Sequence, residues 1–150
     1  MKIIGTTGDN FLQGTPSVDL IRGLVGNDTL LGYDASDRIY GGVGDDVLWG
    51  GTGNDKLWGG SGKDTFNFSI NSDGTKAETG VDKIKDFHPG EDIIVVHTAG
   101  PHGGHDASLS YDAGTGLVMI HNEGGPGPQN YTVAKMSKGL TLSEGDLVLI

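Results

Sequence analysis

The chain has no cysteine and no long apolar run, and these two absences narrow its class. Without cysteine there is neither a disulfide framework nor a thiolate metal site. No stretch approaches the roughly 18 apolar residues that a membrane-spanning helix requires, so we expect a soluble chain. The first eleven residues, MKIIGTTGDNF, lack the apolar stretch of a cleavable signal peptide, so export would need another route.

Positive charge is also scarce in this sequence. Ten Lys and Arg residues stand against twenty Asp and Glu residues, which gives a formal net charge of -10. This balance argues against nucleic acid or an anionic membrane as the main partner and favours cations. The hydrolase motifs H-E-x-x-H and G-x-S-x-G do not occur. We therefore expect no catalysis from this chain alone, although its 150 residues suffice for one folded core.

Glycine, by contrast, is abundant: the chain contains 28, and many recur with a period of nine. From Gly41 to Asn67 the sequence reads GGVGDDVLW, GGTGNDKLW and GGSGKDTFN, three units of the form G-G-x-G-x-D-x-U-x in which U is large and apolar. The same frame runs back without a gap through four more units to Gly5. Because glycine is costly to order, something besides the chain must help to hold this region.

Two columns of the nine-residue frame predict how the units fold. A period of nine fits no helix, so each unit is expected to form a turn and a short strand. The large apolar side chains of position eight are expected to form the core, and position six carries an acid or its amide. Position eight is Leu12, Ile21, Leu30, Ile39, Leu48, Leu57 and Phe66, and position six is Asn10, Asp19, Asp28, Asp37, Asp46, Asp55 and Asp64.

These units predict an all-β fold, a right-handed parallel β-roll. If each unit makes half a revolution, odd units stack in one sheet and even units in the other, with strands about 4.8 Å apart. Stacking then places Asp46 beside Asp64, where an unneutralised pair would repel by about 3 kcal/mol at an effective dielectric near 20. A hard dication removes this repulsion, and a ligand set made only of oxygen suits Ca²⁺ better than Zn²⁺ or Cu²⁺.

The units from Gly41 to Asn67 resemble the repeats-in-toxin (RTX), or hemolysin-type, calcium-binding nonapeptide. The resemblance implies about three to five Ca²⁺ ions, each held between one unit and the unit after next. The first unit would supply the backbone oxygens of positions two and four and its carboxylate, and the second those of positions one and three and its carboxylate. The implied sets are Gly42, Gly44 and Asp46 with Gly59, Ser61 and Asp64; Leu24, Gly26 and Asp28 with Gly41, Val43 and Asp46; Tyr33, Ala35 and Asp37 with Gly50, Thr52 and Asp55; and Gly60, Gly62 and Asp64 with Asp82.

The first units depart from the family pattern. Tyr33 and Ala35 stand where glycine is expected, Asn10 lacks the charge, and Pro16 and Ser17 stiffen the second turn. The first two units are therefore expected to form a cap with weak or absent ions.

The region after the repeats resembles the closing part of this family. Asp82-Lys83-Ile84-Lys85-Asp86-Phe87 matches the D-x-I-x-D-F segment with which members close the roll. We expect a calcium-binding roll over residues 1–87, with the seven nonapeptides at 5–67, and a C-terminal β cap over 88–150. Apolar stretches at 92–96, 117–120, 131–136 and 147–150 are predicted to be its strands.

The C-terminal sequence EGDLVLI has two interpretations. It resembles the uncleaved type I secretion signal of the family, or it is a plain terminal strand. Secretion would suit calcium-dependent folding, since extracellular modules bind Ca²⁺ at about 10⁻⁴ to 10⁻³ M. The family resemblance thus implies a secreted, extracellular module that folds on calcium binding and stabilises or positions a larger secreted protein.

The alternative function is binding of an anionic polysaccharide. Tyr40, Trp49 and Trp58 should point outward, and with Lys56 they form a candidate ligand face, because flat rings suit sugars or a protein surface. The competing interpretation is that the C-terminal strands cover one of these faces. The layout of the chain is similar to the R-modules of mannuronan C5-epimerases, which implies an accessory role in alginate binding. The candidate positive strip contains Arg22, Arg38, Lys56, Lys63 and Lys83.

A histidine-rich stretch offers a second, less favoured metal site. His97, His102 and His105 lie close to Asp106 in sequence, a combination that can bind zinc. A solvated glycine-rich loop is the simpler interpretation.

Overall fold

The computed structural model describes residues 1–70, 80–98, 107–122 and 130–150. Within these ranges the chain forms fourteen strands and no helix. None of the described residues belongs to a helix that could cross a membrane.

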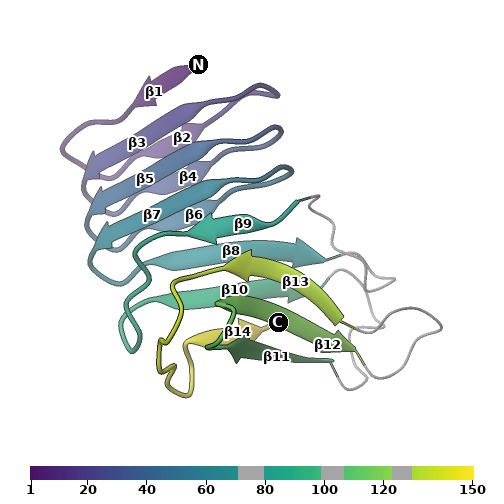
Figure 1. Ribbon diagram of the computed structural model, residues 1–150. Helices are drawn as coiled ribbons and strands as arrows, with labels where there is room; N and C mark the ends of the chain where they lie inside the picture. The colour runs from purple at the N-terminus through teal and green to yellow at the C-terminus, as the bar shows by residue number, and fades with distance from the viewer. Residues whose placement is uncertain (71–79, 99–106, 123–129) are drawn as a thin grey trace.

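The strands form two sheets that face each other (Figure 1). Along the eight-stranded sheet lie β1 (Lys2–Ile4), β3 (Leu20–Val25), β5 (Arg38–Val43), β7 (Lys56–Ser61), β9 (Asp82–Ile84), β13 (Asn130–Lys135), β12 (Leu117–Asn122) and β11 (Ala107–Asp112). Along the six-stranded sheet lie β14 (Leu147–Leu149), β10 (Ile93–Thr98), β8 (Thr65–Ile70), β6 (Val47–Trp49), β4 (Thr29–Leu31) and β2 (Phe11–Gln13).

The nine-residue frame determines this architecture, and the predicted parallel β-roll is confirmed. Strands β2 to β8 each begin at position seven of their unit and alternate between the two sheets. Even-unit strands pair in parallel at two-unit steps, as in Ile21 with Ile39 and Ile39 with Leu57. The odd-unit strands do the same, as in Leu30 with Leu48.

The position-eight residues form the core, as expected from the sequence. From Ile21 to Phe66 these six side chains are fully buried, and they interdigitate between the two sheets. Leu12, in the first coil, is only partly buried against the core because it lies near the N-terminal end of the roll. The even-unit strands are longer than predicted, because pairing continues into the next turn at Leu24 with Gly42 and Val25 with Val43.

The last coil differs from the others in length. Strand β9 pairs with β7 so that Lys83 lies opposite Lys56, a step of 27 residues instead of 18. Parallel pairing continues on the other sheet through β10 and β14, whereas β11, β12 and β13 form an antiparallel meander that extends the eight-stranded sheet. The four apolar stretches predicted to be strands are strands, and β11 is an addition that its mixed sequence, ASLSYD, did not indicate.

Candidate calcium cages along two edges of the roll

Each edge of the roll carries a ladder of residues that lie just before a strand or at its first position, and all of them except the partly buried Asn10 are buried aspartates. One ladder contains Asn10, Asp28, Asp46, Asp64 and Asp92, and the other contains Asp19, Asp37, Asp55 and Asp82. In every step the backbone N–H of one residue donates to the Oδ1 of the next, at 2.7 to 3.0 Å. These charge-assisted bonds hold successive carboxylates in register, and the negative charges accumulate along each edge.

The second oxygen of these carboxylates is unsatisfied in the middle of the roll. The Oδ2 atoms of Asp28, Asp37, Asp46, Asp55 and Asp64 are buried and have no hydrogen-bond donor among the described residues. Burying an unpaired carboxylate oxygen is costly, so each one requires a positive partner. Five such atoms in equivalent positions form a repeated binding feature, and oxygen donors of this kind fit Ca²⁺.

Position-one glycines provide the space beside these oxygens. A Cβ atom placed on Gly41 would collide with the Oδ2 of Asp46 and lie 2.5 Å from the carbonyl oxygen of Gly59. A carboxylate oxygen and a carbonyl oxygen therefore converge on this point from two consecutive coils of the same edge. A cation at this point could bind both oxygens.

The turns adopt left-handed backbone conformations at positions two and four. Gly42 and Gly44 have φ of 129° and 134°, and a Cβ on either would collide with the preceding coil. Leu24, Tyr33 and Ala35 adopt the same region, with φ of 90°, 77° and 74°, and they are the only non-glycine residues among those described that do so. Because side chains disfavour this region, the coil stack imposes the turn on them.

Position two decides whether the carboxylate is satisfied. In the first two units Thr6 and Thr15 do not have a positive φ, and their N–H groups donate to Asn10 Oδ1 at 2.5 Å and Asp19 Oδ2 at 2.6 Å. Where position two is left-handed, from Leu24 onward, the Oδ2 has no such donor. These closed first turns agree with the expectation of weak or absent ions in the first two units, which stays a prediction.

Burial raises the pKa of the ladder carboxyls in the middle of the roll. The pKa of Asp46 rises to about 6 through burial and the nearby Asp28 charge, although the N–H of Asp28 opposes the shift. For Asp64 burial, together with Asp92 and Asp46, raises the pKa to about 7. Asp55 rises to about 7 chiefly through burial. Such shifts express the cost of several negative charges held close together without a counterion.

The structure brings together three of the four residue sets implied by the family resemblance. Asp28, Asp46 and Asp64 adjoin along one edge, with Val43 paired to Ser61 and Gly42 to Gly60. Asp37 adjoins Asp55 on the other edge, where the N–H of Thr52 donates to the carbonyl of Tyr33 at 2.7 Å. Neighbouring turns thus adjoin at each of these three sets, and calcium ligation by their oxygens stays a prediction. The remaining members of these three sets are Leu24, Gly26, Tyr33, Ala35, Gly41, Gly44, Gly50 and Gly59.

The fourth set is wrong in one member. Asp82 does not follow Asp64; its Oδ1 accepts the N–H of Asp55, at 2.9 Å, on the opposite edge. The lengthened coil shifts the frame by nine residues, which moves a position-six residue to the other edge. Asp92 takes the place beside Asp64 instead.

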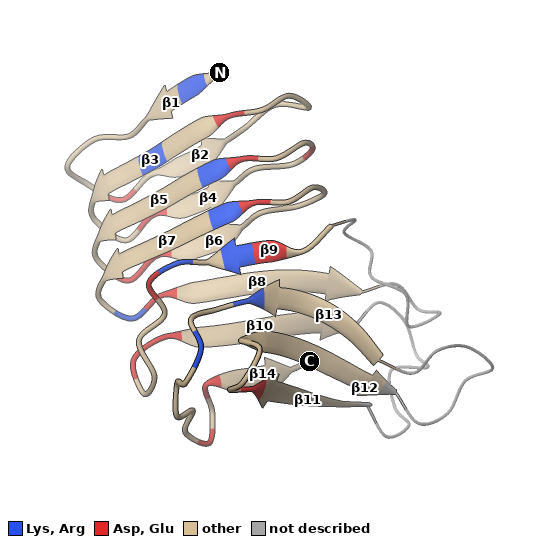
Figure 2. Ribbon diagram, viewed as in Figure 1, with Lys and Arg blue, Asp and Glu red and all other residues tan. Residues whose placement is uncertain are grey.

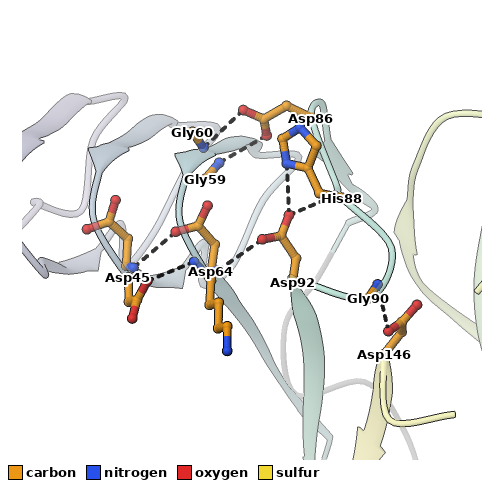
Figure 3. Close-up of polar contacts among 11 residues, drawn as sticks. Asp45, Gly59, Gly60, Asp64, Asp86, His88, Gly90, Asp92 and Asp146 are labelled. Carbon is orange, nitrogen blue, oxygen red and sulfur yellow. Dashed lines mark hydrogen bonds and ion pairs between the residues drawn. The ribbon is translucent and has the colours of Figure 1, made fainter. Parts of the chain in front are cut away.

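Three acidic residues of the C-terminal turns were not found from the repeat frame (Figure 3). Asp92 accepts the N–H of Asp64 at 3.0 Å through Oδ1 and that of His88 at 2.8 Å through Oδ2. Asp86 accepts the N–H groups of Gly59 and Gly60 at 3.0 and 3.1 Å. Asp146 accepts from Gly90 and Ser143. For Asp92 and Asp146 a signal exists, because each directly precedes an apolar strand, as the ladder residues from Asn10 to Asp64 do.

Lys and Arg recur from strand to strand along the eight-stranded sheet (Figure 2). Because Ile39 and Leu57 point into the core, the residues on either side of them in the strand lie on the outer face. One cross-strand row contains Lys2, Leu20, Arg38, Lys56, Lys83 and Lys135, and the next contains Ile4, Arg22, Tyr40 and Trp58. The rings of Tyr40 and Trp58 stack with centroids 4.3 Å apart at 9°, and the Arg22 guanidinium lies 5.3 Å from the Tyr40 ring.

Trp49 lies on the other sheet, away from Tyr40, Lys56 and Trp58. It stacks on His97 of β10, with centroids 4.8 Å apart, and the Nε2 of His97 is 2.8 Å from the Oδ1 of Asn67. His102, His105 and Asp106 lie outside the described residues. Among the residues that are described, no group of three or more His, Cys, Asp or Glu could hold a metal ion.

The fold and its two acidic edges define a calcium-binding β-roll, and a family comparison agrees. Residues 4–39 and 31–66 match the model of the RTX calcium-binding nonapeptide repeat, described as four copies. Residues 4–66 are therefore similar to RTX repeats, a calcium-binding nonapeptide repeat.

Two further comparisons complete the picture. No curated protein matches the chain in sequence. Among solved structures, the chain is similar to the solution structure of the AlgE6R3 subunit from the Azotobacter vinelandii mannuronan C5-epimerase. The two share 26% identity over 87% of this chain and 72% of that chain, with a TM-score of 0.32.

Proposed function

We propose that the chain is an extracellular module whose β-roll folds when calcium binds and then stabilises or positions a larger secreted protein. The observation that carries this proposal is the row of buried, unsatisfied Oδ2 atoms at Asp28, Asp37, Asp46, Asp55 and Asp64. Without a counterion, burial and mutual repulsion oppose folding of the roll. A ligand that binds only the folded state stabilises it by mass action, so calcium concentration would control folding.

The ions would lie between consecutive coils of one edge. One is assigned to Asp28 and Asp46, one to Asp46 and Asp64, and one to Asp37 and Asp55, each with the backbone oxygens implied by the repeat. The second edge continues from Asp55 to Asp82. We infer no catalytic step for these groups: the ion neutralises the carboxylates, and the chain supplies the oxygens around it.

A calcium titration of chelator-treated protein tests this proposal. Far-UV circular dichroism should show cooperative appearance of β signal in the high micromolar to millimolar range, as for about 10⁻⁴ to 10⁻³ M extracellular sites. Magnesium should fail at equal concentration, because it keeps its waters and demands a stricter geometry. A calcium-free protein that already shows the full β signal would contradict calcium-driven folding.

The location and domain division belong to the same proposal. We propose a roll over residues 1–87, a β cap over 88–150, and type I secretion as the route of export. Low cytosolic calcium would leave the chain unfolded until it reaches the outside, where the sites fill. Secretion of the full chain by cells with and without a type I exporter would test the route.

A second candidate function is binding of an anionic polysaccharide such as alginate. The supporting observation is the stacked Tyr40 and Trp58 pair, which lies beside the cationic row through Arg38 and Lys56. Flat rings stack on sugars, and the row supplies charge. Calcium-loaded protein should bind immobilised alginate, and Trp58→Ala or Lys56→Glu should abolish retention without loss of fold. Unchanged retention in both variants would exclude this face.

A further inference from the structure

The acidic and basic side chains in and just after β9 lie in two different places. In the sequence Asp82-Lys83-Ile84-Lys85-Asp86 the two acidic residues are engaged at the edges of the roll, one by the N–H of Asp55 and one by those of Gly59 and Gly60. Ile84 is buried in the core, so the alternation of the strand directs Lys83 and Lys85 to the outer face. The segment is nearly neutral in sequence, but its outer side is positive.

Lysine recurs at the neighbouring positions of the same face. Lys83 pairs in register with Lys56 on one side and with Lys135 on the other. Like charges directly opposite each other in a sheet are destabilising. The ion pairs among the described residues involve none of these lysines. Within the described ranges these lysines therefore have no carboxylate at ion-pair distance.

A cavity opens where these lysines meet. Strands β9 and β13 share only two register pairs before their paths separate, because Lys85 continues along β7 while Met136 bonds to Gly116. The separation leaves a cavity of about 260 Å³, lined by Lys83, Ile84, Lys85, Lys135, Met136 and Ser137. It lies at the boundary between the parallel roll and the antiparallel meander, beside the strand in which the second ladder ends at Asp82.

We propose that this cavity is an oxyanion-binding pocket, which takes a single carboxylate, sulfate or phosphate group between Lys83, Lys85 and Lys135. The charges are the reverse of those in the cages: stacked buried carboxylates there require a cation, and the adjoining exposed ammonium groups here attract an anion. Three ammonium groups supply up to nine N–H donors without acceptors of their own. The pocket goes beyond the proposed function, since it needs neither the aromatic pair nor a polymer.

Titration of calcium-loaded protein with sodium sulfate and with sodium glucuronate tests the pocket, with sodium chloride at matched ionic strength as reference. Amide NMR shifts at Lys85 and Met136 should saturate with sulfate and glucuronate but not with chloride. Lys85→Gln and Lys135→Gln should each weaken the affinity about tenfold, as expected for loss of one charge-assisted contact. Lys56→Gln is the matched control, because it removes a neighbouring charge of the same row outside the cavity.

Two outcomes would overturn the pocket: shifts that do not saturate beyond chloride, or an equal loss in Lys56→Gln, which would indicate only the diffuse field of the face. A short oligouronate distinguishes two sources of the bound group. Competition with sulfate supports a polysaccharide group, and lack of competition supports a small free anion. Failure of the second candidate function can be distinguished from failure of the pocket. If the aromatic face does not bind alginate, Trp58→Ala leaves both alginate retention and sulfate binding unchanged.

Discussion

Asp46 in the middle of the roll and Asp92 near its C-terminal end occupy equivalent ladder positions but are satisfied differently. Both are buried, and the Oδ1 of each accepts the N–H of the preceding ladder residue, at 2.8 Å from Asp28 and 3.0 Å from Asp64. The Oδ2 of Asp92 also accepts the N–H of His88, whereas the Oδ2 of Asp46 has no donor among the described residues. The same ladder thus contains turns that close by themselves and turns that do not.

The difference lies in the residue four places before the carboxylate. His88, Thr6 and Thr15 hold their N–H groups toward the side chain that follows, whereas Gly42 and its equivalents are left-handed and leave it unsatisfied. The pKa values follow the same division. The pKa of Asp146 is lowered: burial acts to raise it, but the hydrogen bonds from Ser143 and Gly90 outweigh that effect. The pKa of Asp46 is raised. At Asp92 and Asp146 the chain itself satisfies the carboxylate, whereas the middle of the roll requires a cation.

Removal of calcium should separate the two regions most clearly. Hydrogen exchange of chelated protein should show protection lost at the amides of Asp28 and Asp46, with opening free energies lower by several kcal/mol. The amides of β12 and β13 should lose much less, because no described residue of these two strands has a buried, unsatisfied carboxylate oxygen. Exchange measured by mass spectrometry with and without chelator provides the test. An equal loss in both regions would show that roll and cap unfold as one unit.

A matched pair of substitutions sharpens the same comparison. Asp46→Asn removes a carboxylate shared by two proposed ions, so the calcium midpoint for folding should rise about tenfold or more. Asp92→Asn should leave the calcium midpoint nearly unchanged but lower the free energy of unfolding by about 1 to 3 kcal/mol, because an amide cannot accept both N–H groups. Calcium titrations and urea unfolding of both variants distinguish these effects. Equal midpoints for the two would contradict the division.

Acidification should act on the middle of the roll in the opposite direction to chelation. Asp46 and Asp64 have folded-state pKa values of about 6 and about 7, above the value of about 3.9 expected when unfolded. The folded, ion-free chain therefore binds more protons, and its stability is highest below pH 4 and is lost as pH rises toward 7. Calcium-free protein should gain β structure between pH 7 and pH 4, as measured by circular dichroism. Calcium affinity should weaken over the same range.

Much of this arrangement could be predicted from the sequence because the repeat is strict. The fold, the core column and the adjoining of Asp28, Asp46 and Asp64 follow from one period of nine. The partner of Asp82 could not be found in the same way, because the coil before it is longer and the frame does not record which edge a residue reaches. Asp92 was missed because its unit has no glycine pair, although its place before an apolar strand resembles the others.

The pocket at Lys83, Lys85 and Lys135 could not be predicted from the sequence. Lys135 is 52 positions from Lys83, and only the pairing of β9 with β13 places them together. The sequence also did not reveal that the residue at position two determines whether the Oδ2 of the carboxylate receives a hydrogen bond. This depends on backbone conformation, which differs between His88 and Gly42 and which residue type alone does not give.

The smallest expected effect is a change in stability on substitution of Ala35, in the strained turn of the fourth unit. Ala35 has φ of 74°, a region that costs a non-glycine residue about 1 kcal/mol or more. Ala35→Gly relieves that strain at the expense of extra freedom in the unfolded chain, so the calcium-loaded protein should gain about 0.5 to 1 kcal/mol.

Gly44→Ala is the opposing control, because its φ is 134° and a Cβ there would collide with the carbonyl of Gly26. This variant should lose more stability than Ala35→Gly gains, since strain and collision add. Thermal unfolding at fixed calcium measures both. If Ala35→Gly is destabilising, the alanine methyl contributes packing that exceeds its backbone strain, and the left-handed turn is then held by contacts of the side chain as well as by the coil stack.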